Sequence, residues 1–369
     1  MRATDFRNYE TLALELDERP VVLNGPNGAG KTNLLEAVSL LAPGRGLGRA
    51  RFGNMIRRGA MSGWAVSVKL HCASGLVDIG TGFNEGDETS ARSVRIDGET
   101  IRGTGKLGQY VRAVWLTPAM DGLFTGAAGE RRRFLDRLIQ SLDPGYRSCV
   151  SHFERAMRQR NRLLENGETS SSLFEGLEIQ MAETGVAMAA ARLDTVARLG
   201  GGSGAARSDT AFPWAVLALE GVLEQRLEGE AAVDTEDAYR EMLGQSRERD
   251  RAARRTLEGP HRSDLIVGHG PKSAPARECS TGEQKALLIG LVLAHARLVK
   301  QQSNGFAPLI LLDEIVAHLD EERRAGLFGE LQRLEAQAWM TGTDPRHFES
   351  WGEKAQAFTV ENGCVLPRS

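Results

Sequence analysis

The segment that most constrains this chain is GPNGAGKT at residues 25–32, which has the form G-x-x-x-x-G-K-[ST] of a phosphate-binding loop. The apolar residues 21–23 before it predict a short buried strand, and residues 33–37 after it predict a helix. In this strand–loop–helix setting, backbone N–H groups and the positive end of the helix converge on phosphate oxygens. The sequence therefore predicts a nucleoside triphosphate site, with Lys31 at the β- and γ-phosphates and Thr32 on Mg²⁺. The predicted nucleotide-binding residues are Gly25, Pro26, Asn27, Gly28, Ala29, Gly30, Lys31, Thr32 and Asn33.

Composition is that of a globular protein: 41% of the 369 residues are hydrophobic, 26% are charged, and the formal net charge is −3. The sequence contains no apolar run long enough to span a bilayer and no N-terminal signal pattern. Its four cysteines are far apart and form no C-x-x-C pair. We therefore expect a reduced, cytoplasmic protein that makes no membrane contact.

Alternation and helical spacing divide the chain into three stretches. Residues 64–70 alternate as a strand does, and Asp97-Gly98 predicts a hairpin turn. From Pro118 the apolar spacing becomes helical, interrupted by a predicted flexible loop at residues 200–204. Strand patterns return after Pro260. We expect an α/β domain built from residues 1–117 and 257–369, in which a phosphate-loop sheet carries a small antiparallel β subdomain, with a mostly helical lobe inserted at residues 118–256.

A second motif is the apolar strand pattern at residues 309–312, which ends in Asp313 and Glu314. Alone this pattern is common, but beside a phosphate loop it has a mechanism. Asp313 is predicted to hold Mg²⁺, and Glu314 to orient and deprotonate the attacking water. Glu314 and Lys31 are the predicted catalytic residues.

A third motif, STGEQK at residues 280–285, admits two interpretations. Ser280 and Glu283 form an S-x-x-E capping box, which any helix can use. They also match the S-x-G-[EQ] signature of ABC-type ATPases, in which Ser280, Gly282 and Glu283 would act on the γ-phosphate held by a second subunit. Residues 317–320, ending in Asp320, match the D-loop that crosses such a dimer seam. The motif order favours an ABC-type head that closes as a dimer around two ATP molecules.

Five further segments lie outside these general ATPase motifs, and the roughly 250 residues between phosphate loop and signature allow a compact lobe but no long coiled-coil arm. With them the chain resembles the RecF family of DNA repair proteins nearly from end to end. The segments are residues 6–9 (FRNY), 27–37 (NGAGKTNLLEA), 117–118 with 131–136 (TP, RRRFLD), 158–164 (RQRNRLL), and 249–250 with 256–265 (RD, TLEGPHRSDL).

The resemblance implies a weak, DNA-dependent ABC-type ATPase of recombinational repair and replication, within the SOS response to DNA damage. It implies cofactors ATP and Mg²⁺, an ATP-dependent homodimer that clamps double-stranded or gapped DNA, and assistance to RecA loading with RecR and RecO. Two departures leave the γ-phosphate sensor unassigned. No histidine follows the strand at residues 337–340, and Gln109 lies too early for a Q-loop glutamine.

Two rival functions follow from the same motifs. A membrane-transporter ATP subunit would place its phosphate loop and signature closer together and carry a switch histidine; a non-hydrolysing scaffold would not need Glu314. Basic residues give candidate DNA contacts at Arg57, Arg58, Arg158 and Arg160. The alternative for the family segments is structural: Phe134, Leu135, Leu163 and Leu164 fit a lobe core, and Arg131–Arg133 fit ion pairs that each contribute little.

Overall fold

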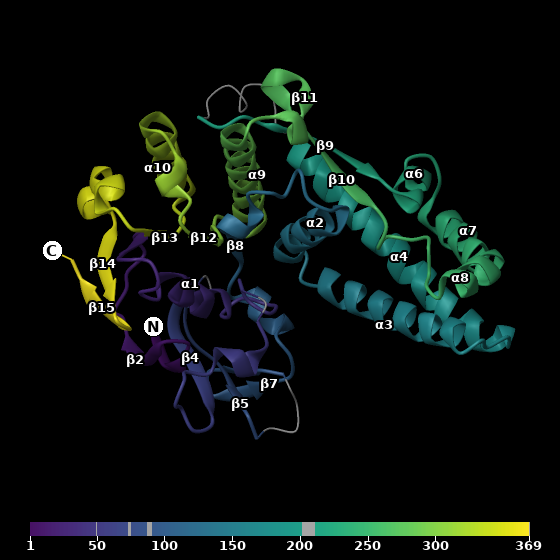
Figure 1. The fold of residues 1–369 in the computed structure, drawn as a ribbon, viewed down its shortest axis with the longest axis horizontal. Helices are drawn as coiled ribbons and strands as arrows, with labels where there is room; N and C mark the ends of the chain where they lie inside the picture. The colour runs from purple at the N-terminus through teal and green to yellow at the C-terminus, as the bar shows by residue number, and fades with distance from the viewer. Residues whose placement is uncertain (49, 73–74, 87–90, 201–210, 369) are drawn as a thin grey trace. The chain divides into compact units, whose positions relative to one another are not determined.

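The structure is a computed structural model that describes residues 1–48, 50–72, 75–86, 91–200 and 211–368. Its described residues fall into two compact units (Figure 1). The first comprises residues 1–121, 211–212 and 288–368, and the second comprises residues 122–200 and 213–287. Both ends of the chain therefore build the first unit. The second unit continues about thirty residues beyond the predicted lobe limit of 256, because strands that follow this limit pair with a strand inside the lobe.

The first unit contains a six-stranded sheet in the order β15-β14-β3-β13-β12-β8. Strands β14, β3, β13, β12 and β8 run parallel, and β15 closes one edge antiparallel to β14. Their bounds are β3 Val21–Asn24, β8 Ala113–Leu116, β12 Leu309–Leu312, β13 Ala338–Gly342, β14 Gln356–Glu361 and β15 Cys364–Pro367. The central strands are buried on both faces, which is why they read as continuous apolar runs in the sequence.

A second six-stranded sheet in this unit is antiparallel, in the order β2-β1-β4-β5-β6-β7. Its strands are β1 Arg2–Phe6, β2 Tyr9–Ala13, β4 Gly63–Cys72, β5 Gly75–Asn84, β6 Ser93–Ile96 and β7 Glu99–Ile101. The predicted hairpin turn is confirmed, because Asp97 and Gly98 both have positive φ between β6 and β7. One hydrophobic core joins this sheet to the parallel one and includes the edge-to-face pair of Phe6 and Trp64.

Helices lie on both sides of the parallel sheet, with α1 (Lys31–Ser39) on one side and α9 (Thr281–Gln302) and α10 (Glu321–Leu334) on the other (Figure 1). The first turns of α9, up to residue 287, belong to the second unit. Short 3-10 segments connect the strands. They are η1 Phe52–Met55, η2 Gly105–Gln109, η3 Pro118–Met120, η6 Val316–His318 and η7 Pro345–Lys354. Among the described residues, no helix is long and apolar enough to cross a membrane.

The second unit is mostly helical, as predicted. Its helices are α2 Ala128–Leu142, α3 Tyr146–Glu165, α4 Ser171–Gly200, α6 Val222–Leu227, α7 Ala232–Gln245 and α8 Arg247–Ala253. Gly200 ends α4, and the rest of the loop predicted at 200–204 lies outside the described residues.

Strand β9 (Ala215–Glu220) was not predicted, and it explains the longer second unit. It pairs with β10 (Asp264–His269), which pairs with β11 (Ala274–Pro275) in a three-stranded sheet. The segments η4 (Gly270–Lys272) and η5 (Ala276–Glu278) lead from this sheet toward α9. The strand predicted at residues 265–267 therefore forms in the lobe sheet and not in the head.

Candidate nucleotide site and nucleic-acid contacts

The phosphate loop connects β3 to α1, as the sequence predicts. Gly25 passes so close to β14 that an added Cβ would lie 2.1 Å from the carbonyl oxygen of Val360. Gly30 caps α1 with φ +113°, a conformation that side chains with a Cβ rarely adopt. Pro26, Asn27 and Gly28 are exposed. The loop thus presents backbone N–H groups and a helix N-terminus to solvent, a combination that fits phosphate.

Lys31 is held against this loop. Its side chain is 4% exposed, and Nζ donates hydrogen bonds to the carbonyl oxygens of Gly25 (2.7 Å) and Pro26 (2.9 Å). Burial lowers the pKa of Lys31, opposed by the nearby carboxylates of Glu314 and Asp313. Lys31 therefore places its ammonium group inside the curve of the loop.

Thr32 and Asp313 meet although 281 residues separate them. Thr32 Oγ1 lies 3.0 Å from both carboxylate oxygens of Asp313. They meet because the parallel strands β3 and β12 both end at this edge of the sheet, with only β13 between them. Burial raises the pKa of Asp313, while hydrogen bonds from Thr341 and Thr32 lower it. An exposed hydroxyl beside a carboxylate is a donor set of hard oxygen ligands, which fits Mg²⁺.

Thr341 on β13 connects the two acids, and sequence reasoning assigned it no role. Its hydroxyl donates to Asp313 Oδ1 at 2.9 Å and accepts the Glu314 N–H at 2.8 Å. Thr341 is fully buried. Glu314 itself has φ +54°, a strained backbone conformation for a side chain of this type. The Thr341 hydroxyl is thus one of the contacts that hold this backbone in place.

The FRNY segment packs against the phosphate loop from the first strands. Asn8 Nδ2 donates to the Ala29 carbonyl (3.0 Å), and the Tyr9 hydroxyl donates to the Gly30 carbonyl (2.9 Å). Arg7 makes a two-pronged ion pair with Glu36 of α1, with distances of 2.6 and 2.9 Å. These residues support the phosphate loop and α1, which gives a physical reason for the FRNY segment and residues 35–37 (LEA) to occur in one chain.

Ser280 and Glu283 form the capping box at the start of α9. The Ser280 N–H donates to Glu283 Oε2 (3.0 Å), and the Glu283 N–H donates to Ser280 Oγ (3.4 Å). A hydrogen bond from Lys272 and those from Ser280 lower the pKa of Glu283 to about 2. Ser280 and Gly282 are exposed, and nothing within 4 Å would meet a Cβ at Gly282. The capping box is therefore present, and the N-terminal end of α9 remains open to an anion.

Asp320 caps α10, where its side chain accepts the Arg323 N–H at 2.8 Å. Ala317, His318 and Asp320 are exposed next to it. The predicted D-loop is therefore a surface segment that follows the acidic strand end by a few residues.

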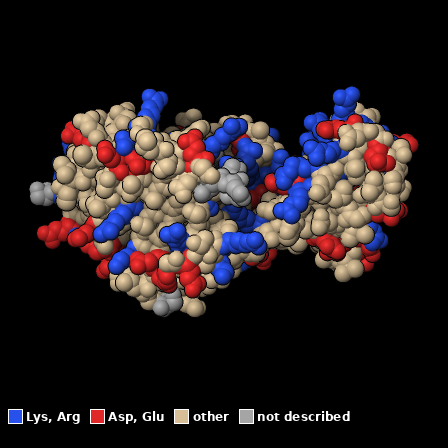
Figure 2. Space-filling model, turned by 90° about the horizontal axis from the view of Figure 1, so that it is seen from below, with Lys and Arg blue, Asp and Glu red and all other residues tan. Residues whose placement is uncertain are grey.

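The four candidate DNA contacts differ in their exposure and in their ion pairs. Arg57 forms an ion pair with Asp5 (2.8 Å), Arg58 is exposed, and Arg158 is exposed beside Glu154 (3.5 Å). Charges of both signs alternate over the face seen in Figure 2.

Arg160 requires a correction, because it is fully buried. Its guanidinium group contacts Glu178 (3.1 Å), Asp250 (2.7 Å) and Thr256 (2.9 Å). With its donors used inside the lobe it cannot reach a phosphate from solvent. Arg158 and Arg160 are two residues apart on the same helix, so their side chains point about 200° apart. One can therefore be exposed while the other is buried.

The family segments around Arg160 build the polar core of the lobe. Arg192 of α4 pairs with Asp136 and donates to the Pro260 carbonyl. Arg131 makes a two-pronged ion pair with Asp264, at 2.8 and 2.7 Å. Phe134 and Leu164 lie in the apolar core, as the structural alternative predicted. These segments therefore hold helices and the lobe sheet together.

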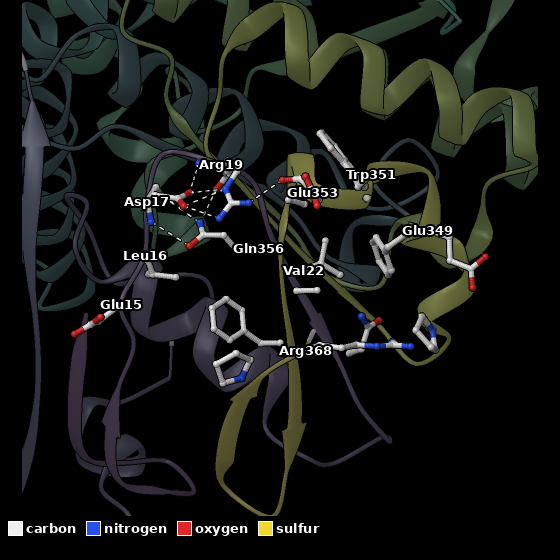
Figure 3. Close-up of a pocket in the computed structure, with 18 residues that line it drawn as sticks. Glu15, Leu16, Asp17, Arg19, Val22, Glu349, Trp351, Glu353, Gln356 and Arg368 are labelled. Carbon is white, nitrogen blue, oxygen red and sulfur yellow. Dashed lines mark hydrogen bonds and ion pairs between the residues drawn. The ribbon is translucent and has the colours of Figure 1, made fainter.

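A cavity of about 750 Å³ in the first unit is lined by none of the predicted site residues (Figure 3). Phe348, Trp351 and Phe358 contribute buried aromatic walls. Asp17 and Arg19 form an ion pair at its edge (2.7 Å). Its lining comes from residues 15–24 and 345–368, which the sequence gives no reason to bring together.

Comparison with solved structures supports the fold. The recombination mediator protein RecF-ATPrS of the RecFOR pathway superposes with a TM-score of 0.84 at 20% identity, covering 100% of this chain and 97% of that one. An SMC head domain derived from Pyrococcus furiosus gives a TM-score of 0.53 at 14% identity, covering 100% of this chain and 94% of that one. The fold is that of an ABC-type ATPase head with an inserted lobe, as the sequence predicted.

Sequence comparison is more specific. Residues 1–365 match the family described as RecF/RecN/SMC N terminal domain. The DNA replication and repair protein RecF of Rhizobium johnstonii is 54% identical over 366 residues, 99% of this chain and 97% of that protein. The corresponding protein of Agrobacterium fabrum is 51% identical over 366 residues, with the same coverage. The chain belongs to the RecF family, which confirms the resemblance found in the sequence.

Proposed function

We propose that this protein is a cytoplasmic ATPase of recombinational DNA repair and replication whose homodimer closes on DNA when ATP is bound. The observation that carries the proposal is the meeting of Thr32 and Asp313 at 3.0 Å beside an open phosphate loop. RecF-ATP of the RecFOR pathway has the same fold, with a TM-score of 0.82. We further propose double-stranded and gapped DNA, RecR, RecO and RecA as partners.

In the proposed reaction, a water oxygen attacks the γ-phosphorus, the bond to the ADP oxygen breaks, and Glu314 accepts a proton from the water. Lys31 turns from the carbonyls of Gly25 and Pro26 to the β- and γ-phosphate oxygens. Thr32 and Asp313 would hold Mg²⁺, which neutralises charge on those oxygens when bound. Hydrolysis at this site is proposed to be slow, as the family resemblance implies.

Closure would come from a second copy of the chain. In this arrangement Ser280, Gly282 and Glu283 face the γ-phosphate held by the partner, and Asp320 lies at the seam. The exposure of Ser280, Gly282 and Asp320 supports this role, because each is available to another subunit. DNA would be held through its backbone, with Arg57, Arg58 and Arg158 as proposed contacts, so sequence preference is slight and salt sensitivity is strong.

Light scattering of Glu314→Gln, with and without ATP–Mg²⁺ and a gapped duplex, tests the proposal. Removing the base traps ATP, so the mass should double with ATP, and DNA should be retained only then. Glu85→Gln is a matched control, because Glu85 is exposed in the turn that follows β5. Its ATP-bound dimer should decay as fast as that of the wild type. A Glu314→Gln protein that stays monomeric yet binds DNA would show that nucleotide and closure are uncoupled.

A further inference from the structure

Helix α3 carries three arginines along its exposed face. Arg155, Arg158 and Arg162 are spaced by three and four residues, so they lie on one side of the helix. All three are exposed, and the opposite face holds the buried Phe153, Arg160 and Leu164, among other residues. Seven residues span about 10 Å of helix. Such a row is long enough to meet more than one phosphate of a strand whose charges recur about every 3.4 Å along the duplex axis.

Two more arginines adjoin this row from the end of α8. Thr256 donates its N–H to Asn161 Oδ1 on α3 at 2.8 Å, and its hydroxyl donates to the same oxygen at 2.8 Å. Those bonds hold the segment that contains Arg254 and Arg255 against α3. Both arginines are exposed.

The charge of this surface is largely uncompensated. Arg155, Arg162, Arg254 and Arg255 make no ion pair with any residue that the structure describes, and Arg158 makes a long contact of 3.5 Å with Glu154. On α3 the flanking acids are Glu154 and Glu165. Arg254 and Arg255 add two positive charges in a segment where Glu258 is paired with Arg249 and Glu248 is exposed. An exposed mixed-charge helix normally pairs its charges, so this row of unpaired arginines favours an anionic partner.

The helix beneath this surface is fixed. Arg160, on the opposite face of α3, is clamped by Glu178 of α4 and Asp250 of α8. The exposed arginines therefore project from a rigid support, which reduces the entropy lost when they bind.

We propose that Arg155, Arg158, Arg162, Arg254 and Arg255, the α3 arginine surface, bind the phosphate backbone of duplex DNA. The inference rests on the proposed DNA function and names the lobe helix that carries it. Guanidinium groups bind phosphate through two parallel hydrogen bonds, and contacts of this kind carry no base specificity. Arg160, which was predicted as a DNA contact together with Arg158, supports this surface from the buried side and does not contact DNA.

The test is anisotropy of a fluorescent 30-base-pair duplex with ATP–Mg²⁺, measured over a series of salt concentrations. Arg155→Glu/Arg162→Glu reverses two unpaired charges on the surface. Arg226→Glu/Arg240→Glu is the matched control, because it makes the same change in net charge elsewhere in the lobe, on α6 and α7. Thermal unfolding and nucleotide binding of both proteins check that each is folded.

Each contacted phosphate contributes about 0.9 to the slope of log K against log salt. We expect the surface variant to bind at least tenfold more weakly, with a slope lower by about two, and the control to bind as the wild type does. Equal binding by the surface variant and the wild type would overturn the inference while leaving the DNA function intact. Equal losses in both variants would also overturn it, since net charge alone would then explain binding. A wild type that binds no duplex would overturn the proposed function itself.

Discussion

Replacing Thr341 with valine isolates one hydroxyl at the centre of the candidate site. Valine has nearly the same volume, so the variant leaves no cavity in this fully buried position. It removes the hydrogen bond to Asp313 Oδ1 and leaves the Glu314 N–H without its acceptor. The variant therefore tests whether β13 holds both acidic residues in place.

The cost follows from these two contacts. A buried polar group that loses its partner costs about 1–3 kcal/mol. Asp313 keeps Thr32 as a donor, so most of the penalty falls on the Glu314 N–H. The Glu314 N–H is partly buried, so we expect the free energy of unfolding of the first unit to fall by about 1–3 kcal/mol. Thr341→Ser keeps the hydroxyl and should lose only about 0.8 kcal/mol, the value of one buried methylene.

Urea unfolding followed by tryptophan fluorescence measures the stability of this unit, because it holds four of the five tryptophans, among them the buried Trp339 two residues away on β13. ATP hydrolysis over a Mg²⁺ series is the second measurement. A loosened Asp313 should raise the Mg²⁺ concentration needed for half-maximal rate in Thr341→Val, and Thr341→Ser should restore it. If valine and serine variants unfold alike and need the same Mg²⁺, the hydroxyl has no positioning role and the reasoning is wrong.

Four further perturbations test other parts of the molecule. Lys31→Ala should abolish ATP-dependent dimerisation in light scattering, and a variant that still dimerises would show that the phosphate loop has no part in closure. Ser280→Arg should block closure but leave ATP binding by each subunit intact, as equilibrium dialysis would report. Arg160→Leu leaves the buried Asp250 carboxylate without an ion pair, whereas Glu178 keeps Arg247 as a partner. The substitution should destabilise the lobe by about 3–5 kcal/mol, measured as faster amide exchange in α3; exchange at the wild-type rate would contradict this. Burial lowers the pKa of His261, so the stability it contributes is complete above its unfolded pKa of about 6.5 and is lost as pH falls through the folded pKa. The amide protection factor in α3, which removes the pH dependence of intrinsic exchange, should therefore fall below pH 6.5 in the wild type and less so in His261→Gln.

Local patterns were sufficient where one segment carries all the information for an element. The phosphate loop between a buried strand and a helix, the Asp97-Gly98 hairpin and the buried strand before Asp313 are all present as predicted. Helical spacing gave α2, α3 and α4 because their apolar stripes face the lobe core. Strand β9 was not predicted, because its short alternation of apolar and other residues lies in a region of otherwise helical spacing.

The sequence by itself determined the family and the ABC-type fold, because motif order and spacing lie along the chain, and it supplied the residues that we propose bind ATP. Only the tertiary structure decided which distant residues meet. Strand order places β13 between β3 and β12, so that Thr341 contacts Asp313, and the turn after β1 brings Asn8 and Tyr9 under the phosphate loop. It also decided which arginines reach solvent. Arg158 and Arg160 look alike in sequence, but helix geometry turns one outward and buries the other among carboxylates, since a buried charge persists only where it is paired.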